Sequence, residues 1–113
     1  MFVIEVSTDM EWRQQAQQAS GDYLIFKHST TCPISAKAYR EVSEFAATNP
    51  LPVVLVKVIE ARPLSLRIAD ELTIPHASPQ VILMKGDRAV WNTSHYDITK
   101  EHMEAALNEQ VQK

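Results

Sequence analysis

Strand-like and helix-like apolar patterns alternate along this chain of 113 residues, and this alternation limits the folds open to it more than any other feature. The segment 53–59 is almost entirely β-branched and apolar, which is typical of a strand covered on both faces. The segment 33–46 instead repeats its apolar residues every three to four positions, as a helix does. We predict strands at residues 2–6, 23–27, 53–59, 81–84 and 89–91, and helices at residues 8–19, 33–48, 63–72 and from 99 onwards.

Short polar signals mark several boundaries between these elements. Thr8 and Glu11 have the spacing of a capping box, and Pro33 suits a first helical position because its missing N–H has no partner there. The turn residues 85–88 between two apolar runs predict a β-hairpin. The predicted order is β-α-β-α-β-α-β-β-α, which implies an α/β protein with a mixed sheet and helices on both faces. This is the order of the thioredoxin fold.

The composition is that of an ordinary globular protein, with 45% hydrophobic and 22% charged residues. The formal net charge of −3 does not indicate a basic surface that would bind nucleic acid. Apolar runs such as residues 53–56 are far shorter than the ~20 residues that span a membrane, and the first residues do not resemble a secretion signal. We therefore expect a single domain over residues 1–113 in the cytoplasm, with no nucleic-acid or membrane partner.

The chain has one cysteine, Cys32, between a predicted strand and a predicted helix. A thiol at a helix N-terminus experiences the positive end of the helix dipole and N–H groups that lack helical partners. Both effects favour the thiolate, which is the form that attacks disulfides. Lys27 and His28 would add positive potential nearby. The alternative is a buried and inert cysteine, but the threonines and the proline around Cys32 are unlike a core strand, so we interpret it as the nucleophile.

Ser35 occupies the position at which dithiol oxidoreductases carry a second cysteine. Because Cys32 is the only cysteine, an internal disulfide cannot form. A single thiol can still attack a mixed disulfide, carry a small thiol as an adduct, and be released by a second small thiol. We expect Ser35 to lie in the first helical turn, where its hydroxyl is placed to donate a hydrogen bond toward the Cys32 sulfur.

The loop 74–80, which precedes the fourth predicted strand, is a second candidate element of the site. Proline at a strand start is expected for ordinary steric reasons. A cis Ser78–Pro79 bond, however, would turn the chain so that backbone groups of Ala77 or Ser78 face the helix start. Those groups would then pair with an incoming strand that carries a disulfide.

Several motifs, in order and at matching spacing, resemble those of the monothiol bacilliredoxins of the bacillithiol redox system: Thr31-Cys32-Pro33-Ile34-Ser35, Ser78-Pro79-Gln80, Trp91, Ser94-His95 and Ile98-Thr99. The resemblance implies a thioredoxin-like fold, a cytoplasmic location, and removal of bacillithiol from proteins that carry it as a mixed disulfide. It also implies that Cys32 attacks this disulfide, that Thr31, Pro33 and Ser35 support it in the active-site loop, and that the Ser78–Pro79 bond is cis.

The same resemblance implies how the cycle ends and which partners it needs. A second bacillithiol releases the first as the symmetric disulfide, which a separate NADPH-dependent flavoenzyme then reduces. Bacillithiol is accordingly expected as a co-substrate, with no tightly bound cofactor. We further expect S-bacillithiolated client proteins as partners, an indirect link to the bacillithiol-disulfide reductase, and a monomer.

Some positions depart from related families and leave alternatives open. Thr31 stands where thioredoxins have tryptophan, and Phe26 where they have a buried acid; threonine before Cys-Pro is glutaredoxin-like and suits a small-thiol substrate. One alternative is a glutaredoxin-like iron–sulfur cluster carrier, although Pro33 stands where such proteins have glycine. Another is a thioredoxin-fold binding module without chemistry. We expect no metal site, because the spacing of the candidate ligands fits no compact set: His76, His95, His102 and Cys32.

Overall fold

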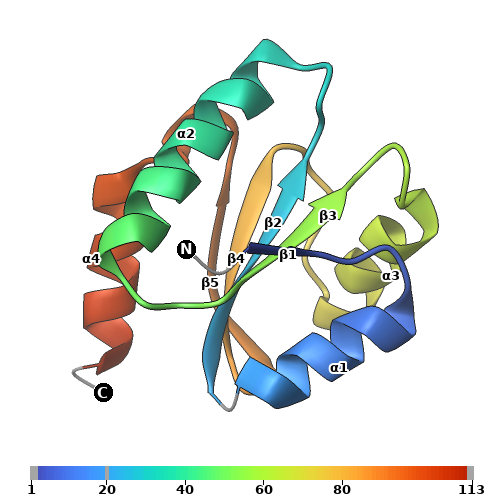
Figure 1. Cartoon of the computed structure of the whole chain (residues 1–113), viewed down its shortest axis with the longest axis horizontal. Coiled ribbons are helices and arrows are strands. Elements are labelled where there is room, and N and C mark those ends of the chain that lie inside the picture. The colour runs from blue at the N-terminus through green and yellow to red at the C-terminus, as the bar shows by residue number, and fades with distance from the viewer. Residues whose placement is uncertain (1–2, 20, 112–113) are drawn as a thin grey trace.

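The computed structural model describes residues 3–19 and 21–111, and it confirms the predicted order of strands and helices (Figure 1). Residue 2 of the first predicted strand lies outside the described residues. The elements are β1 (Val3–Glu5), α1 (Asp9–Ala19), β2 (Asp22–His28), α2 (Pro33–Thr48), β3 (Val53–Lys57), α3 (Arg62–Leu72), β4 (Gln80–Lys85), β5 (Arg88–Ser94), the 3₁₀ helix η1 (His95–Asp97) and α4 (Lys100–Val111).

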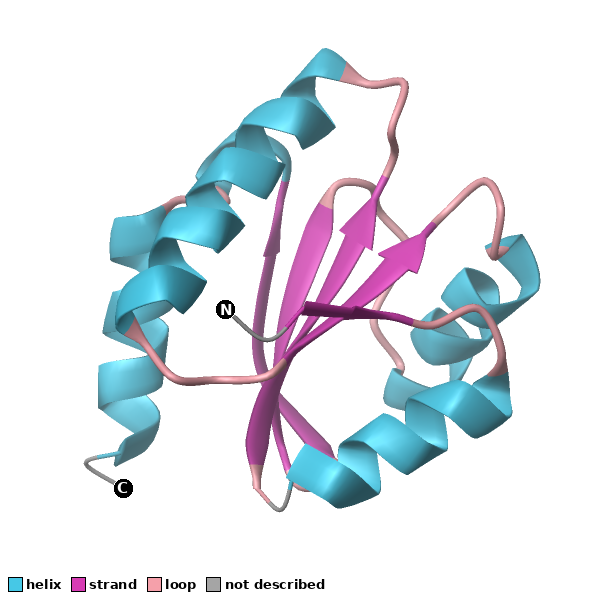
Figure 2. Cartoon of the chain, in the orientation of Figure 1, coloured by secondary structure: helices cyan, strands magenta, loops and turns pink. Residues whose placement is uncertain are grey.

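The strands form one mixed sheet in the order β1-β3-β2-β4-β5. β1 and β2 both pair with β3 in parallel, whereas β4 is antiparallel to β2 and β5 is antiparallel to β4. Helices α2 and α4 cover one face of this sheet and α1 and α3 cover the other (Figure 2). The predicted α/β thioredoxin-like architecture is therefore confirmed. In the part of the chain that the structure describes, no helix is long and apolar enough to cross a membrane.

The central strand β2 contributes to the core on both faces of the sheet. Because side chains alternate along a strand, Leu24 and Phe26 pack under α2 and α4, while Tyr23 and Ile25 pack under α1 and α3. All of these side chains are at most 1% exposed. Burial on both faces explains why this segment is apolar without an alternating pattern.

Local interactions set several element boundaries as predicted. The Thr8 hydroxyl accepts the N–H of Glu11 at 3.1 Å, and the Glu11 carboxylate accepts the N–H of Thr8 at 3.1 Å, which completes the capping box of α1. The β4–β5 hairpin turns through Gly86 and Asp87, and Gly86 adopts the positive φ of +64° that glycine tolerates without strain.

Two boundaries differ from those predicted by two residues or more, and the others by at most one residue. β3 ends at Lys57 rather than at residue 59, because the Ala61 N–H donates to the Lys57 carbonyl at 2.8 Å and turns the chain toward α3. Ile59, in this turn, is 61% exposed. β5 is longer than expected and runs through Ser94, because its partner β4 extends the ladder as far as Gln80.

Candidate thiol site

Cys32 is the residue that immediately precedes α2. Its backbone is extended, with φ −109° and ψ 123°, so that it forms the N-cap, and Pro33 follows in the first helical turn. The Cys32 carbonyl accepts the N–H of Ala36 at 3.0 Å, which is the first hydrogen bond of the helix. The thiol is therefore held at the positive end of a helix of 16 residues, as the sequence analysis expected.

The surroundings of the thiol are open to solvent on one side. Cys32 is partly exposed, and the side chains of Thr31 and Pro33 beside it are exposed. The Thr31 hydroxyl lies 3.3 Å from that of Ser29, so this contact stays within the loop. Within the described residues no hydrogen bond reaches the Cys32 sulfur. A substrate can approach Cys32 from solvent without moving a helix or strand.

Ser35 is fully buried in the first turn of α2. Its hydroxyl contacts residues at the end of β2 rather than the cysteine. It accepts the backbone N–H of Ser29 at 2.9 Å and lies 2.7 Å from His28 Nδ1. The expected hydrogen bond from Ser35 to the Cys32 sulfur is therefore not formed, because the hydroxyl is engaged on the strand side. Through these two hydrogen bonds Ser35 instead links the start of α2, next to Cys32, to the end of β2.

His28 is 8% exposed, and its ring packs between Phe26 and Tyr39, each with its ring centroid 5.2 Å away. Burial lowers the pKa of His28, and the nearby charge of Lys57 lowers it further, while Glu60 acts in the opposite direction. When the ring is neutral and carries its proton on Nε2, the Ser35 hydroxyl donates a hydrogen bond to Nδ1. This arrangement satisfies both groups without a charge at the buried position.

Lys27 lies on the other face of the sheet from α2. Its side chain is fully buried, and Nζ donates to the backbone carbonyl of Ser65 in α3 at 2.9 Å. Burial alone lowers the pKa of Lys27 to about 8. The structure thus brings His28 and Ser35 together near Cys32, but it places Lys27 on the α3 side of the sheet.

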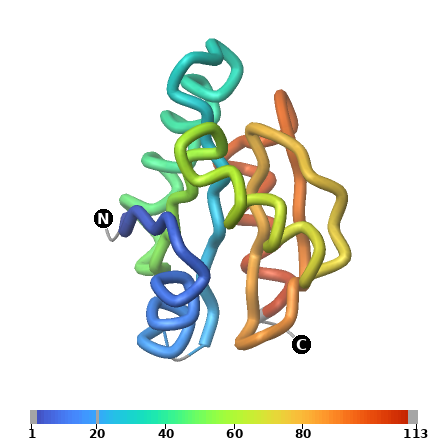
Figure 3. Tube along the Cα trace, turned by 90° about the vertical axis from the view of Figure 1, so that its right-hand side faces the viewer, coloured from blue at the N-terminus to red at the C-terminus, as the bar shows by residue number. Residues whose placement is uncertain are grey.

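The loop before β4 reaches the same edge of the sheet as the loop that carries Cys32. Lys27 near the end of β2 pairs with Gln80 at the start of β4, and both loops lie at one end of the molecule (Figure 3). The Ser78–Pro79 bond is cis, as the resemblance implied. Ala77 and Ser78 are partly exposed at this edge.

Three further hydrogen bonds fix this loop, and sequence reasoning did not predict them. The Pro79 carbonyl accepts the N–H of His95 at 3.0 Å, the Gln80 side-chain amide donates to the Pro75 carbonyl at 3.2 Å, and His76 Nε2 lies 2.9 Å from the Ser65 hydroxyl. His95 adopts a φ of +57°, which is uncommon for a residue with a side chain. The Gln80–Pro75 hydrogen bond lies within the loop, whereas the other two join the loop to η1 and α3, and no sequence spacing identifies those partners.

The histidines considered as metal ligands have other contacts. His102 Nδ1 donates to the Asp97 carbonyl at 2.7 Å, and His95 Nδ1 lies 3.1 Å from the Ser94 hydroxyl. Burial and the charges of Lys27 and Arg62 lower the pKa of His76. Among residues 3–19 and 21–111, no group of three or more His, Cys, Asp or Glu side chains is arranged to hold a metal ion.

A thioredoxin fold with a partly exposed cysteine at the start of α2 defines the class of thioredoxin-like thiol oxidoreductases. Residues 4–103 match the sequence model of the family described as monothiol bacilliredoxin BrxC. The match covers most of the chain, and the chain belongs to the monothiol bacilliredoxin family. Family and fold together give it a thiol redox function, with redox partners related to bacillithiol.

Solved structures agree with this placement. The chain is similar to a candidate oxidoreductase with a thioredoxin fold, at 30% identity over 93% of each chain and a TM-score of 0.88. It is also similar to poplar thioredoxin h, at 15% identity, a TM-score of 0.82, and coverage of 100% of this chain and 99% of that one. Mitochondrial thioredoxin 3 from Saccharomyces cerevisiae matches at 17% identity, a TM-score of 0.75, and coverage of 95% and 94%. The two thioredoxins show the fold alone.

Proposed function

We propose that this protein removes bacillithiol from S-bacillithiolated proteins through a mixed disulfide on Cys32. The observation that carries the proposal is the single, partly exposed cysteine at the start of α2 in a chain that belongs to the monothiol bacilliredoxin family. A lone thiol needs a small thiol to complete its cycle, because no second cysteine is present to resolve the adduct. Bacillithiol is the small thiol that the family description implies.

The chemistry is two successive thiol–disulfide exchanges. The Cys32 thiolate attacks the bacillithiol sulfur of the mixed disulfide, so that a Cys32–bacillithiol S–S bond forms and the client S–S bond breaks. The client sulfur leaves as a thiolate with the electron pair and takes a proton from solvent. A second bacillithiol thiolate then attacks the bacillithiol sulfur on Cys32, which yields bacillithiol disulfide and returns the Cys32 thiolate. A separate reductase would restore the small thiol, so no resident cofactor is needed.

In this proposal the neighbours of Cys32 orient the reacting groups and do not themselves react. Pro33 begins the helix, Thr31 lines the open side of the loop, and Ser35 holds that loop against β2 through Ser29 and His28. His28 acts as a positioning residue because it is buried and contacts Ser35 rather than the sulfur.

The loop before β4 supplies the other side of the proposed site. The backbone groups of Ala77 and Ser78 would pair with the client segment that carries the disulfide, since they are partly exposed at the same sheet edge as Cys32. Hydrogen bonds from His95 to Pro79 and from Gln80 to Pro75 keep the loop in place. These hydrogen bonds hold the loop in one conformation, which supports a docking role for it.

Intact mass spectrometry tests this function. Mixing the reduced protein with bacillithiol disulfide should give one bacillithiol adduct per chain, and added bacillithiol should remove it. The same protein unfolded in urea is the matched control, because it keeps the thiol and loses the helix start; adduct formation should then be much slower. Equal rates in the folded and unfolded protein, or a coloured iron–sulfur centre in freshly purified protein with no adduct, would contradict the proposal.

A further inference from the structure

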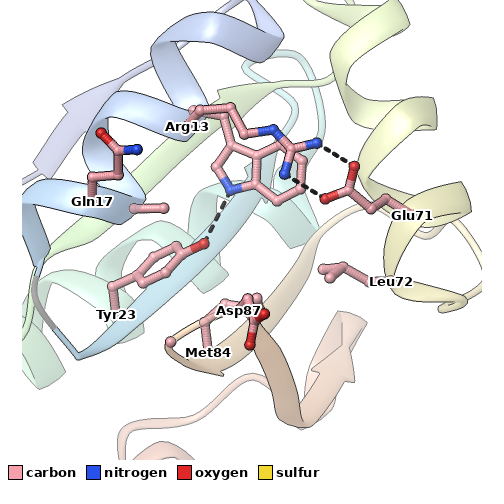
Figure 4. Close-up of a pocket in the computed structure, with 10 residues that line it drawn as sticks. Arg13, Gln17, Tyr23, Glu71, Leu72, Met84 and Asp87 are labelled. Carbon is pink, nitrogen blue, oxygen red and sulfur yellow. Dashed lines mark hydrogen bonds and ion pairs between the residues drawn. The ribbon is translucent and has the colours of Figure 1, made fainter.

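We propose that the face of the sheet under α1 and α3 carries a second binding pocket, which takes a small amine with an apolar body. A cavity of about 200 Å³ opens between α1, β2, α3 and the β4–β5 turn (Figure 4). Its walls come from four separate parts of the chain and are mostly apolar. The side chains on which the proposal rests are Trp12, Arg13, Tyr23, Glu71, Met84 and Asp87.

The pocket is distinct from the thiol site in both face and position. Tyr23 lies at the beginning of β2, whereas Cys32 follows the other end of that strand. The strand from Tyr23 to His28 alone spans roughly 16 Å at about 3.3 Å per residue. The pocket also lies under α1 and α3, and Cys32 begins α2 on the opposite face. A ligand in this pocket does not contact the sulfur.

The floor of the pocket is preformed. Trp12 is 2% exposed and Tyr23 is 1% exposed, and the indole Nε1 of Trp12 donates to the Tyr23 hydroxyl at 3.1 Å. This hydrogen bond fixes the two rings relative to each other, so the buried base of the pocket is rigid. Met84 completes the floor, and its thioether adapts readily to the shape of an apolar group.

An ion pair between the two helices forms one side of the rim. The Arg13 guanidinium binds both carboxylate oxygens of Glu71, which joins α1 to α3 (Figure 4). Arg13 also lies 4.6 Å from the centroid of the Trp12 ring and 3.4 Å from the Asp9 carboxylate. The positive charge of Arg13 is therefore compensated, and this side of the rim carries no free charge for an anionic ligand.

Asp87 forms the opposite side of the rim and gives the pocket its charge preference. It lies in the β4–β5 turn beside Met84, across the pocket from Arg13 (Figure 4). Its side chain is exposed, and none of the ion pairs within the described part of the chain involves its carboxylate. Lys85 and Arg88 flank Asp87 in the turn but do not line the pocket, whereas the lining residues Arg13 and Glu71 pair with each other. The lining charge that is left is therefore negative, and it favours a ligand with a single positive charge.

The size of the cavity limits the ligand to one ring with a short side chain. An apolar cavity of about 150 Å³ is enough for benzene, so about 200 Å³ accommodates a phenyl group with two further heavy atoms. Apolar walls with a few placed polar groups are the usual composition of small-molecule sites. The chemical class that fits is a monocyclic arylalkylamine in its protonated form.

Titration with three probes of similar size tests the proposal: benzylamine, benzyl alcohol and benzoate. Binding is followed by backbone amide shifts in NMR and by Trp12 fluorescence in a Trp91→Phe variant, in which Trp12 is the remaining tryptophan. We expect saturable shifts around Ala16, Tyr23 and Gly86, about two- to five-fold tighter binding of the amine than of the alcohol, and weakest binding of the acid. High salt should remove the preference for the amine.

Two variants identify the groups responsible. Asp87→Asn should reduce the affinity for the amine to that for the alcohol, whereas Glu101→Gln, which removes one exposed negative charge on the other face, should leave both affinities unchanged. Ala16→Leu should fill the cavity and abolish binding of all three probes while the circular dichroism stays native. The proposal is overturned if no probe saturates, if the amine binds no more tightly than the alcohol, or if Asp87→Asn retains the preference.

Discussion

Replacing Lys27 by methionine should change how the free energy of unfolding depends on pH between pH 7 and pH 10. The Lys27 side chain is fully buried, and its Nζ donates to the Ser65 carbonyl. No carboxylate within residues 3–19 and 21–111 forms an ion pair with it. Burial without a counter-ion lowers the pKa of Lys27 from 10.5 to about 8. Methionine has a similar length and carries no charge to desolvate.

The sign and size of the effect follow from these two pKa values. Between pH 8 and pH 10.5 the unfolded chain holds the Lys27 proton while the folded chain releases it, so stability rises with pH in this window. Below pH 8 both states are protonated, and the unfavourable free energy of the buried ammonium is fully present, at about 3 kcal/mol. About 2.5 kcal/mol of it disappears between pH 7 and pH 10.

Urea unfolding of the wild type and Lys27→Met at pH 7, 8, 9 and 10 measures this contribution. Taking the difference between the two proteins cancels the titration of other groups, such as Tyr23. The stability of Lys27→Met relative to the wild type should be about 2.5 kcal/mol greater at pH 7 than at pH 10. Lys85→Met, at an exposed position, should show a difference that stays within about 0.5 kcal/mol. A difference for Lys27→Met that does not change with pH would mean that burial does not lower the pKa of Lys27.

Three further predictions concern Ser35 and His28. Ser35→Ala should lower the free energy of unfolding by about 1–3 kcal/mol in urea, because the partly buried Ser29 N–H and the buried His28 Nδ1 lose their partner. A change below about 0.5 kcal/mol would show that these two hydrogen bonds do not stabilise the fold. Because burial and Lys57 lower the pKa of His28, the unfolded state binds more protons below pH 6.5, and stability falls as the pH decreases there. His28→Phe should reduce this acid sensitivity between pH 7 and pH 5, and an unchanged pH dependence would contradict it. Ser35→Cys should form an internal disulfide with Cys32, seen as the loss of two hydrogens in the intact mass, whereas intermolecular dimers alone would mean that the two positions do not meet.

The sequence patterns predicted most of the fold because they are strong and local. Alternation of apolar periods, the capping box at Thr8 and Glu11, and the hairpin turn at Gly86 and Asp87 all involve neighbouring residues. The end of β3 was misjudged because Val58 is apolar and buried even though it lies beyond the strand, where its N–H donates to the His28 carbonyl. Apolar character alone does not distinguish a strand residue from a buried turn residue.

The candidate site was predictable only in part, for a related reason. The position of Cys32 at a helix start follows from the proline after it and from the strand before it, and both are local features. The sequence did not show on which face of the sheet the Lys27 side chain lies. Because β2 is buried on both faces, its apolar pattern does not identify the face that each residue occupies. Likewise the contact of Ser35 with His28 depends on how the helix folds back onto the strand, which no spacing rule specifies.

Single-turnover transfer of bacillithiol from a modified client protein, followed by rapid quenching in acid and intact mass spectrometry, tests the proposed role of Cys32. We expect the client to lose bacillithiol at the same rate as the wild-type protein gains one adduct on Cys32, and free bacillithiol then to remove the adduct. With Cys32→Ser neither change should occur above the uncatalysed rate. Loss of bacillithiol from the client at the wild-type rate in Cys32→Ser, or release from the client with no adduct on Cys32, would mean that Cys32 is not the nucleophile that carries bacillithiol.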